Sequence, residues 1–193
     1  MESVQRFMGA ALALSILGAS SAAAAQSTDR QSEIVYLTPF LGAEYVGIRS
    51  AALQSDFQGV NTTRSSGVGM AYGAHAGVVL GSFRLGLLYQ QTRLFNEDDR
   101  HYNKLYLEAG LRGRRGVVGL NVMLAGGWAF FGANGLPQRD GVGGRLSFAA
   151  DFYLTPNFSL GPELNVDGAA YFGNDTAYGA WGVTGALRMG LHL

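Results

Sequence analysis

Ionisable side chains recur along this sequence at positions where they could form either a charge network or a reactive site. Carboxylates and cationic groups that leave water together must pair and hydrogen-bond, because an unpaired buried charge is very costly. The candidates for such a network are Glu44, Arg84, Lys104, Glu108, Arg145, Asp151, Glu163, Asp167 and Arg188. These residue types predict a plug of paired charges, and the same set could instead line a narrow passage for ions or small solutes.

Hydrolysis is the second chemistry that the residue types allow. A serine nucleophile needs a histidine base within hydrogen-bond reach and a third group that orients the base. Ser147, His75 and Asp151 supply these types, but nothing in the sequence places the three together. The absence of cysteine excludes thiol catalysis and zinc-thiolate sites. We therefore expect no enzymatic activity, no catalytic residue, no metal and no cofactor.

Composition restricts the class of protein. The chain has 193 residues, which suits one domain, and 29 of them are glycine. Charged residues make up 15% of the sequence, and 14 basic residues balance 14 acidic ones. A neutral chain has no long-range attraction for nucleic acid, so we expect no nucleic-acid partner.

The first 25 residues differ from the rest of the chain. Arg6 is followed by an apolar stretch from Phe7 to Leu17, and Ala23-Ala24-Ala25 precedes Gln26. A positive start, a short apolar run and a small-residue cleavage site are typical of a secretory signal peptide. The apolar run is far shorter than the roughly 20 residues of a membrane-spanning helix. We therefore expect residues 1–25 to be a cleaved signal peptide and residues 26–193 to form the mature domain.

The mature chain repeats one pattern, in which residues alternate with a period of two and a turn follows. Scattered glycine disfavours helix, so the alternation predicts strands. We expect strands at 34–49, 67–80, 83–94, 101–112, 117–131, 142–154, 158–172 and 177–193. Tight turns are predicted at 81–82, 113–116 and 155–157, and longer polar links at 50–66, 96–100, 132–140 and 173–176. Short turns that alternate with long links are typical of outer-membrane barrels.

The two faces of the predicted strands differ in the size of their side chains. In 83–94, for example, Phe83, Leu85 and Leu87 share one face, and Arg84 and Gly86 share the other. Small and charged residues suit a narrow lumen, and bulky apolar residues suit lipid. The opposite register would place five cations in hydrocarbon, at a total free-energy cost of about 10–20 kcal/mol. These cations are Arg84, Lys104, Arg112, Arg145 and Arg188.

Two further features of the strands lead to expectations. Pro39 and Pro162 fall within predicted strands, and because a closed barrel has no edge to host proline we expect bulges or strand ends there. Aromatic residues gather near strand ends, which is typical of the girdles at the two membrane interfaces. They are Trp128, Phe130, Phe172, Tyr178 and Trp181 at one end and Phe83, Phe152 and Phe158 at the other.

One hairpin carries a resemblance to a known family. Residues 151–164, Asp-Phe-Tyr-Leu-Thr-Pro-Asn-Phe-Ser-Leu-Gly-Pro-Glu-Leu, resemble a hairpin of the small outer-membrane β-barrel domain family, the OmpA/OmpX-like barrels. The strand count and the signal peptide extend the resemblance over the mature chain. The chain departs from the family in ending at Leu193, where an aromatic residue is usual. The resemblance implies an outer-membrane location and a role in envelope integrity, surface contact or limited permeation.

Together these observations predict an all-β fold, an eight-stranded antiparallel up-and-down transmembrane β-barrel in the bacterial outer membrane. We expect a structural or surface-interaction role with a plugged lumen, and a narrow pore is the alternative. A lipid-modifying enzyme and a soluble carrier of the lipocalin type are further alternatives. The expected partners are outer-membrane lipids and the outer-membrane assembly machinery. The polar link at 50–66 could contact a surface partner, because loops carry most binding functions on rigid scaffolds.

Overall fold

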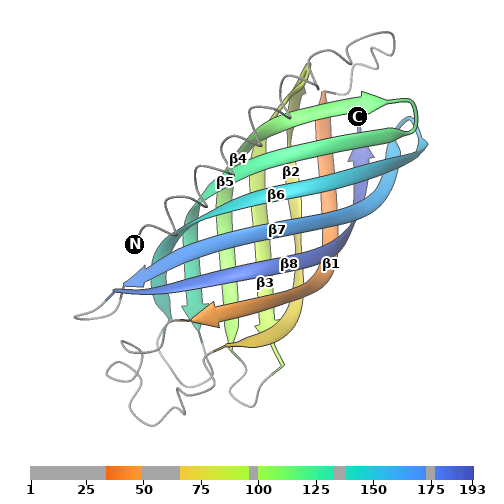
Figure 1. Ribbon diagram of the computed structural model, residues 1–193. Helices are drawn as coiled ribbons and strands as arrows, with labels where there is room; N and C mark the ends of the chain where they lie inside the picture. The colour runs from red at the N-terminus through yellow and green to blue at the C-terminus, as the bar shows by residue number, and fades with distance from the viewer. Residues whose placement is uncertain (1–33, 49–65, 96–99, 133–137, 173–176) are drawn as a thin grey trace, which may run out of the picture.

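The chain forms eight antiparallel strands in a computed structural model that describes residues 34–48, 66–95, 100–132, 138–172 and 177–193 (Figure 1). The strands are β1 (Val35–Ile48), β2 (Gly67–Leu80), β3 (Phe83–Leu94), β4 (His101–Arg115), β5 (Val118–Gly132), β6 (Arg139–Thr155), β7 (Phe158–Phe172) and β8 (Ala177–His192). The predicted strands are confirmed to within a few residues. The predicted signal peptide lies outside the described residues.

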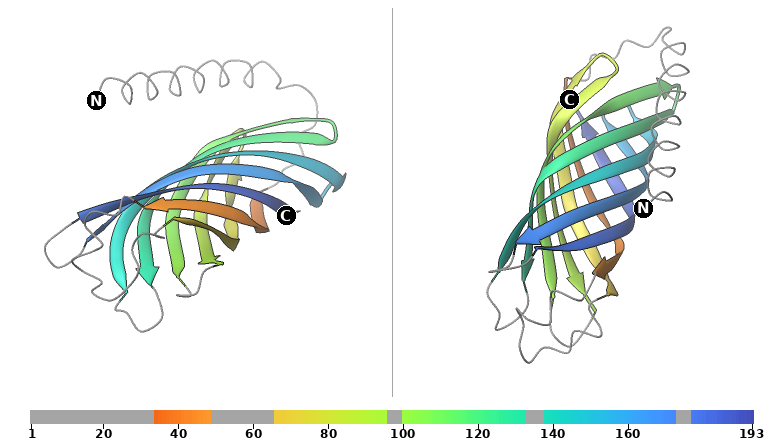
Figure 2. Two further views of the ribbon diagram at one scale, coloured as in Figure 1. Left: turned by 60° about the horizontal axis from the view of Figure 1, so that its bottom comes forward. Right: turned by 60° about the vertical axis from the view of Figure 1, so that its left-hand side comes forward.

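The sheet closes on itself as an up-and-down barrel. Each strand pairs with its neighbours in the sequence, and β1 pairs with β8 to complete the ring, which the two views of Figure 2 show from different sides. Closure leaves no strand edge unpaired. No helix in the described part of the chain is long and apolar enough to cross a membrane.

Short hairpin turns join the strands at one end of the barrel. They are formed by Gly81 and Ser82, by Gly116 and Val117, and by Pro156 and Asn157. The predicted four-residue turn at 113–116 is therefore wrong, because β4 continues to Arg115. Gly113 still pairs with Leu120, and only Gly116 takes the positive φ, 59°, that a tight turn needs. Most of the predicted longer links lie outside the described residues.

The prediction of bulges or strand ends at the two prolines is also wrong. Pro39 lies within β1, where the pairing with β8 skips Thr38 and Pro39 and resumes in the same register at Phe40. Pro162 lies within β7, and the pairing with β6 is likewise interrupted there without a shift. Each proline lacks one N–H, so it interrupts the ladder on one side only and the other neighbour stays paired.

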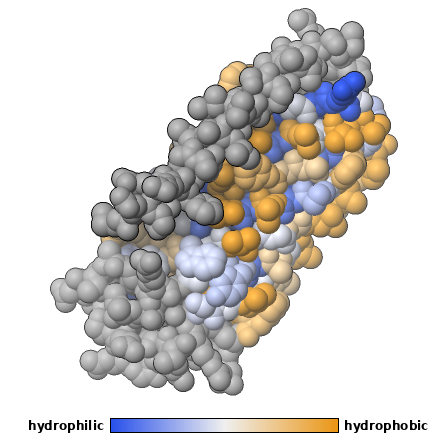
Figure 3. Space-filling model, viewed as in Figure 1, coloured by the Kyte–Doolittle hydropathy of each residue, from blue (hydrophilic) through white to orange (hydrophobic). Residues whose placement is uncertain are grey.

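The barrel is polar and aromatic inside and apolar outside. Side chains alternate between buried and exposed along the strands, as the period of two dictates. Large apolar residues cover the exterior, and Leu107 and Leu124 are 66% and 65% exposed. Figure 3 shows hydrophobic residues over the described strands on one face of the barrel. The inward and outward faces predicted from the sequence are confirmed.

Exposed aromatic residues lie near both ends of the strands. Trp128, Phe172 and Trp181 lie toward the ends away from the hairpins, and Phe83 and Phe152 lie near the hairpins. Phe130 and Phe158 are partly buried, and the side chain of Tyr178 lies outside what the structure describes. That these residues mark two membrane interfaces stays a prediction.

The hairpin at Gly81 provides a test of backbone geometry that is free of packing effects. Its φ is 67°, and a Cβ added there would meet no atom within 4 Å. We expect Gly81→Ala to lower the free energy of unfolding by about 1–2 kcal/mol, the cost of the left-handed region for an ordinary residue. Gly81→Asn should cost less, because asparagine enters this region more readily. Urea unfolding in detergent micelles measures both, and equal losses would contradict this account.

Candidate functional site

The interior of the barrel contains every residue of the predicted charge network. All of them are buried, with exposures from 0% for Glu44 to 7% for Asp167. Their contacts divide them into two groups along the barrel axis. The loop-end cluster comprises Glu44, Gln90, Thr92, Lys104, Arg145 and Asp167, and the hairpin-end cluster comprises Tyr36, His75, Arg84, Glu108, Asn121, Asp151, Glu163 and Arg188.

Lys104 is at the centre of the loop-end cluster. Its Nζ donates to Glu44 Oε1 at 2.5 Å and to Asp167 Oδ1 at 2.7 Å. Gln90 Nε2 donates to Glu44 Oε2 at 2.8 Å, and Arg145 donates to the Gln90 side-chain oxygen. Arg145 also lies 3.6 Å from Asp167 Oδ2. The cluster thus has two carboxylates and two cations, and these four residues lie on four different strands.

A glycine opposite these carboxylates makes room for them. A Cβ added at Gly182 on β8 would lie 2.4 Å from Glu44 Oε1 and 3.2 Å from both carboxylate oxygens of Asp167. Contacts that short are sterically forbidden or strained, so a side chain at this position would push the carboxylates away from Lys104. The inward-facing glycine is therefore part of the cluster, although it carries no charge.

Arg188 and Asp151 form the strongest pair of the hairpin-end cluster. Arg188 donates from Nε and Nη2 to the two oxygens of Asp151, at 2.9 and 2.7 Å. Such a two-bond fork is among the strongest ion-pair geometries. Asn121 extends the contact, because it donates to Asp151 at 2.8 Å and accepts from Arg84 at 2.7 Å. The Arg84 guanidinium lies 3.7 Å from the centre of the Tyr36 ring.

His75 bridges two carboxylates in the same cluster. Its Nδ1 is 2.8 Å from Glu108 Oε2, and its Nε2 is 3.2 Å from Glu163 Oε1. Neutral imidazole has one N–H donor, whereas the charged form has two. Because both nitrogens face carboxylate oxygens, we assign His75 as the imidazolium. The cluster then contains three cations (His75, Arg84 and Arg188) and three carboxylates (Glu108, Asp151 and Glu163).

From the sequence, His75 was considered only as a possible base, and it was not included in the network. The predicted set has five carboxylates and only four cations. This imbalance was the available signal that an inward-facing cation had been left out. Arg112 was omitted in the same way, although it is buried and donates to the Tyr153 hydroxyl at 2.5 Å. No sequence pattern could have identified Tyr36, Gln90 or Asn121 as partners, because their contacts depend on which strands face each other across the lumen.

The structure does not bring the three candidate hydrolytic residues together. Both ring nitrogens of His75 contact glutamates, and Asp151 is bonded to Arg188 and Asn121. A different serine, Ser159, lies 2.8 Å from His192 Nε2, but it is fully buried. Among the described residues, no group of three or more His, Cys, Asp or Glu side chains is placed to hold a metal ion.

Aromatic side chains lie at both ends of the lumen. The loop-end aromatic layer consists of Tyr102, Phe131 and Tyr171, whose ring centres lie 4.9 to 6.3 Å apart. All three side chains are almost completely buried. At the hairpin end, the Arg114 guanidinium lies 3.8 Å from the centre of the Tyr153 ring, which also contacts His192. Charged groups are thus enclosed between two aromatic ends.

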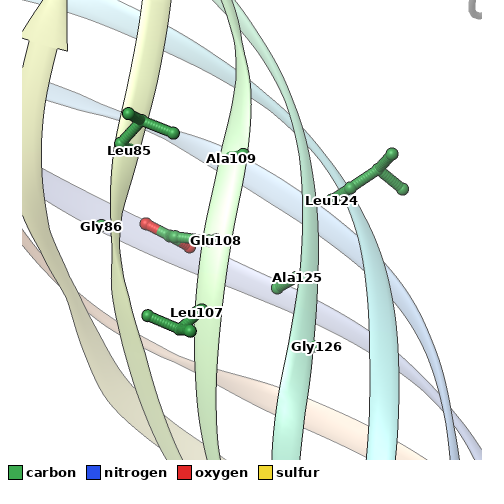
Figure 4. A pocket seen from close by; sticks show the side chains of 8 residues that line it. All are labelled: Leu85, Gly86, Leu107, Glu108, Ala109, Leu124, Ala125 and Gly126. Carbon is green, nitrogen blue, oxygen red and sulfur yellow. The ribbon is translucent and has the colours of Figure 1, made fainter.

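In the described part of the barrel, an open hollow lies on the exterior wall. It measures about 510 Å³ and lies over β3, β4 and β5, with Leu85, Leu107 and Leu124 among its lining residues (Figure 4). Its one charged lining residue is Glu108, which is already engaged by Tyr36 and His75 within the barrel. An open apolar hollow without convergent polar groups has nothing to orient a reaction, so the lumen remains the candidate site.

Substitution of Gly182 tests whether the loop-end cluster depends on this glycine. We expect Gly182→Ala to lower the free energy of unfolding by about 1–3 kcal/mol, because an overpacked core must shift its side chains. Gly185→Ala on the same strand is the matched control, since its Cβ would meet no atom within 4 Å on the exterior. Urea unfolding in lipid vesicles compares the two. If both variants lose the same stability, the contact with the carboxylates has no energetic role.

Comparison with known proteins supports the architecture. No family model matches the sequence, and no curated protein matches it in sequence. The structure matches that of Neisserial surface protein A with a TM-score of 0.63 and 11% identity, over 82% of this chain and 97% of that one. Looser matches include the N-terminal β-barrel domain of Pseudomonas aeruginosa OprF (TM-score 0.39, 14% identity, 81% and 97% covered) and Ail of Yersinia pestis (0.38, 17%, 79% and 97%). The closed ring of eight strands and the match to Neisserial surface protein A show that the chain has the fold of the small eight-stranded outer-membrane β-barrels. This is the fold that the resemblance at residues 151–164 implies.

Proposed function

We propose that this protein is an integral β-barrel of the bacterial outer membrane with a structural, envelope-integrity or surface-contact role and a lumen closed by paired charges. One observation carries the proposal, namely that the barrel is polar inside and apolar outside. A water-soluble barrel would need the opposite arrangement, with polar groups facing solvent. Contiguous apolar patches of this extent are rare on soluble monomers and mark membrane or protein contacts.

The packing of the lumen favours a plug over a pore. An eight-stranded barrel is just wide enough for side chains to fill it. Here the inward charges contact one another directly, as in Lys104 with Asp167 at 2.7 Å and Arg188 with Asp151 at 2.7 Å. Because these charges contact one another, they do not form the separate rings of charged side chains along which an ion could pass. A narrow, weakly selective pore is the second candidate, because the same charges would line its path.

We further propose that the protein has no enzymatic activity. The buried histidine that could act as a base is engaged on both nitrogens, and Ser159 with its partner His192 is closed off from solvent. Its partners would be outer-membrane lipids and the outer-membrane assembly machinery. A surface partner could bind the link at 50–66, of which the structure describes only Ser66.

Arginine placed on the exterior tests whether this surface faces hydrocarbon. Leu107 lies in the middle of β4, and Leu80 is the last residue of β2, next to a hairpin. In lipid vesicles, we expect Leu107→Arg to lower the free energy of unfolding by about 2–4 kcal/mol and Leu80→Arg by about 0–1 kcal/mol, since the cost depends on depth. A protein whose exterior faces water would show no such difference, and both variants would then refold equally well without lipid.

Ion flux distinguishes the plug from the pore. Protein refolded into liposomes should release no trapped ions above the rate of empty liposomes, because the lumen charges are paired and packed. Insertion is verified by urea resistance and protease protection of the barrel. Arg84→Ala and Glu163→Ala are measured alongside the unmodified protein. Reproducible flux through the unmodified protein that changes with these substitutions would contradict the plug and establish the charges as the lining of a pore.

A further inference from the structure

Arginine is concentrated at the hairpin end of the barrel. The described segments at this end are 34–38, 79–84, 110–119, 151–160 and 188–193. Their arginines are Arg84, Arg112, Arg114, Arg115 and Arg188. The one acidic side chain in the same described segments is Asp151, and both of its oxygens accept from Arg188. The basic side chains at this end therefore outnumber the acidic ones by a wide margin.

Three of these arginines lie in the hairpin that joins β4 to β5. Leu111 pairs with Phe83, the first residue of β3, and β4 continues past that point to Arg115. Because side chains alternate along a strand, Arg112 and Arg114 are on the lumen side and Arg115 is on the exterior. Arg112 is buried, Arg114 is half-buried and Arg115 is exposed. We call these three residues the arginine rim, and a ligand can reach its exposed members from solvent without entering the barrel.

The two lumen-side arginines of the rim lie against one aromatic ring. The guanidinium carbons of Arg112 and Arg114 are 5.5 and 3.8 Å from the centre of the Tyr153 ring. Arg112 Nη2 donates to the Tyr153 hydroxyl at 2.5 Å, and Arg114 Nε donates to the Gly116 carbonyl at 3.1 Å. These contacts bring two like charges close together, so an anion bound beside them would offset their repulsion. They also hold both guanidinium groups in place, which lowers the entropy lost when a ligand binds.

The number of guanidinium groups indicates the chemistry of the ligand. A carboxylate has two oxygens and can be satisfied by one guanidinium, as the fork between Arg188 and Asp151 shows. A phosphate group has more acceptor oxygens, so it can accept from more than one guanidinium. The planar donor pairs of arginine also match phosphate oxygens better than a lysine ammonium does. We propose that the arginine rim binds a phosphate group, supplied by a phospholipid headgroup or by inorganic phosphate.

The exterior beside the rim suits a phospholipid. Val117, at the tip of the same hairpin, is 66% exposed, and Phe83 on the neighbouring strand is 61% exposed. An arginine at the edge of an apolar surface can keep its stem on that surface while its guanidinium reaches the polar headgroups. Arg115 is placed in this way, because Leu111 and Gly113 precede it on the outward face of β4. The proposal adds a ligand class at one end of the barrel and does not depend on the cellular role of the protein.

The signals of the arginine Nε–H groups in proton–nitrogen correlation NMR test the site in the unmodified protein. The protein is kept in uncharged maltoside micelles at constant ionic strength. Inorganic phosphate, phosphatidylglycerol and diacylglycerol are added in separate titrations, and diacylglycerol has the acyl chains without the phosphate. We expect a saturable shift of the Arg114 signal with a phosphate-bearing addition and none with diacylglycerol. Arg93 is the matched control, because it is exposed near the other end of β3 and should shift much less.

Each outcome either identifies the source of the phosphate or overturns the proposal. A shift with phosphatidylglycerol alone assigns a lipid headgroup, and a shift with inorganic phosphate alone assigns a soluble ligand. Shifts with both assign the phosphate chemistry that the two share. The absence of a saturable shift with either would overturn the proposal. Equal shifts at Arg114 and Arg93 would also overturn it, because any exposed arginine would then bind phosphate equally well.

Substitution within the rim checks the assignment independently. We expect Arg114→Gln to weaken the binding of the phosphate-bearing ligand about tenfold, since it removes a hydrogen bond between charged groups. Arg93→Gln is the control variant and should leave the affinity unchanged. Isothermal titration calorimetry measures both affinities, and the backbone amide spectrum verifies that each variant is folded. The same affinity in both variants would contradict a site at the arginine rim.

Discussion

Five carboxylates lie inside a closed barrel whose lumen is only wide enough for side chains to fill it. Each carboxylate needs a partner, because an unpaired buried charge has a very high free-energy cost. This requirement makes the register of the strands consequential. A shift by one residue would turn every lumen charge outward and every bulky apolar side chain inward. The two clusters around Lys104 and Arg188 therefore lock the barrel in one arrangement, in addition to whatever stability they contribute.

Glycine and large polar side chains act together in this interior. Tyr36 lies over Gly77 and Gly86, and Glu44 lies against Gly182, at positions where any Cβ would collide. A barrel of this width can hold long charged side chains only if neighbouring positions have none. The high glycine content is thus explained in part by the charge network, and it also accounts for the weak helical signal of the sequence.

The lumen combines features of a plug and of a pore. Direct ion pairs and aromatic ends close it, although the buried charged side chains give it the polar lining of a pore. Permeation would then depend on the aromatic ends and the ion pairs moving, and not on the polarity of the interior.

The sequence by itself determined the eight strands and the face on which the charged residues lie, because a period of two needs no knowledge of neighbours. It left His75 and Arg112 out of the charge network. It did not determine which charges pair. His75 and Glu163 are 88 positions apart, and Lys104 and Asp167 are 63 apart, so these contacts depend on strand tilt and closure. The sequence also did not predict the local geometry at two positions. Gly113 lies in a paired strand although the sequence around it is typical of a turn, and at Pro39 the pairing is interrupted without a bulge or a strand end. Tertiary structure decided these points, because each is set by residues on other strands.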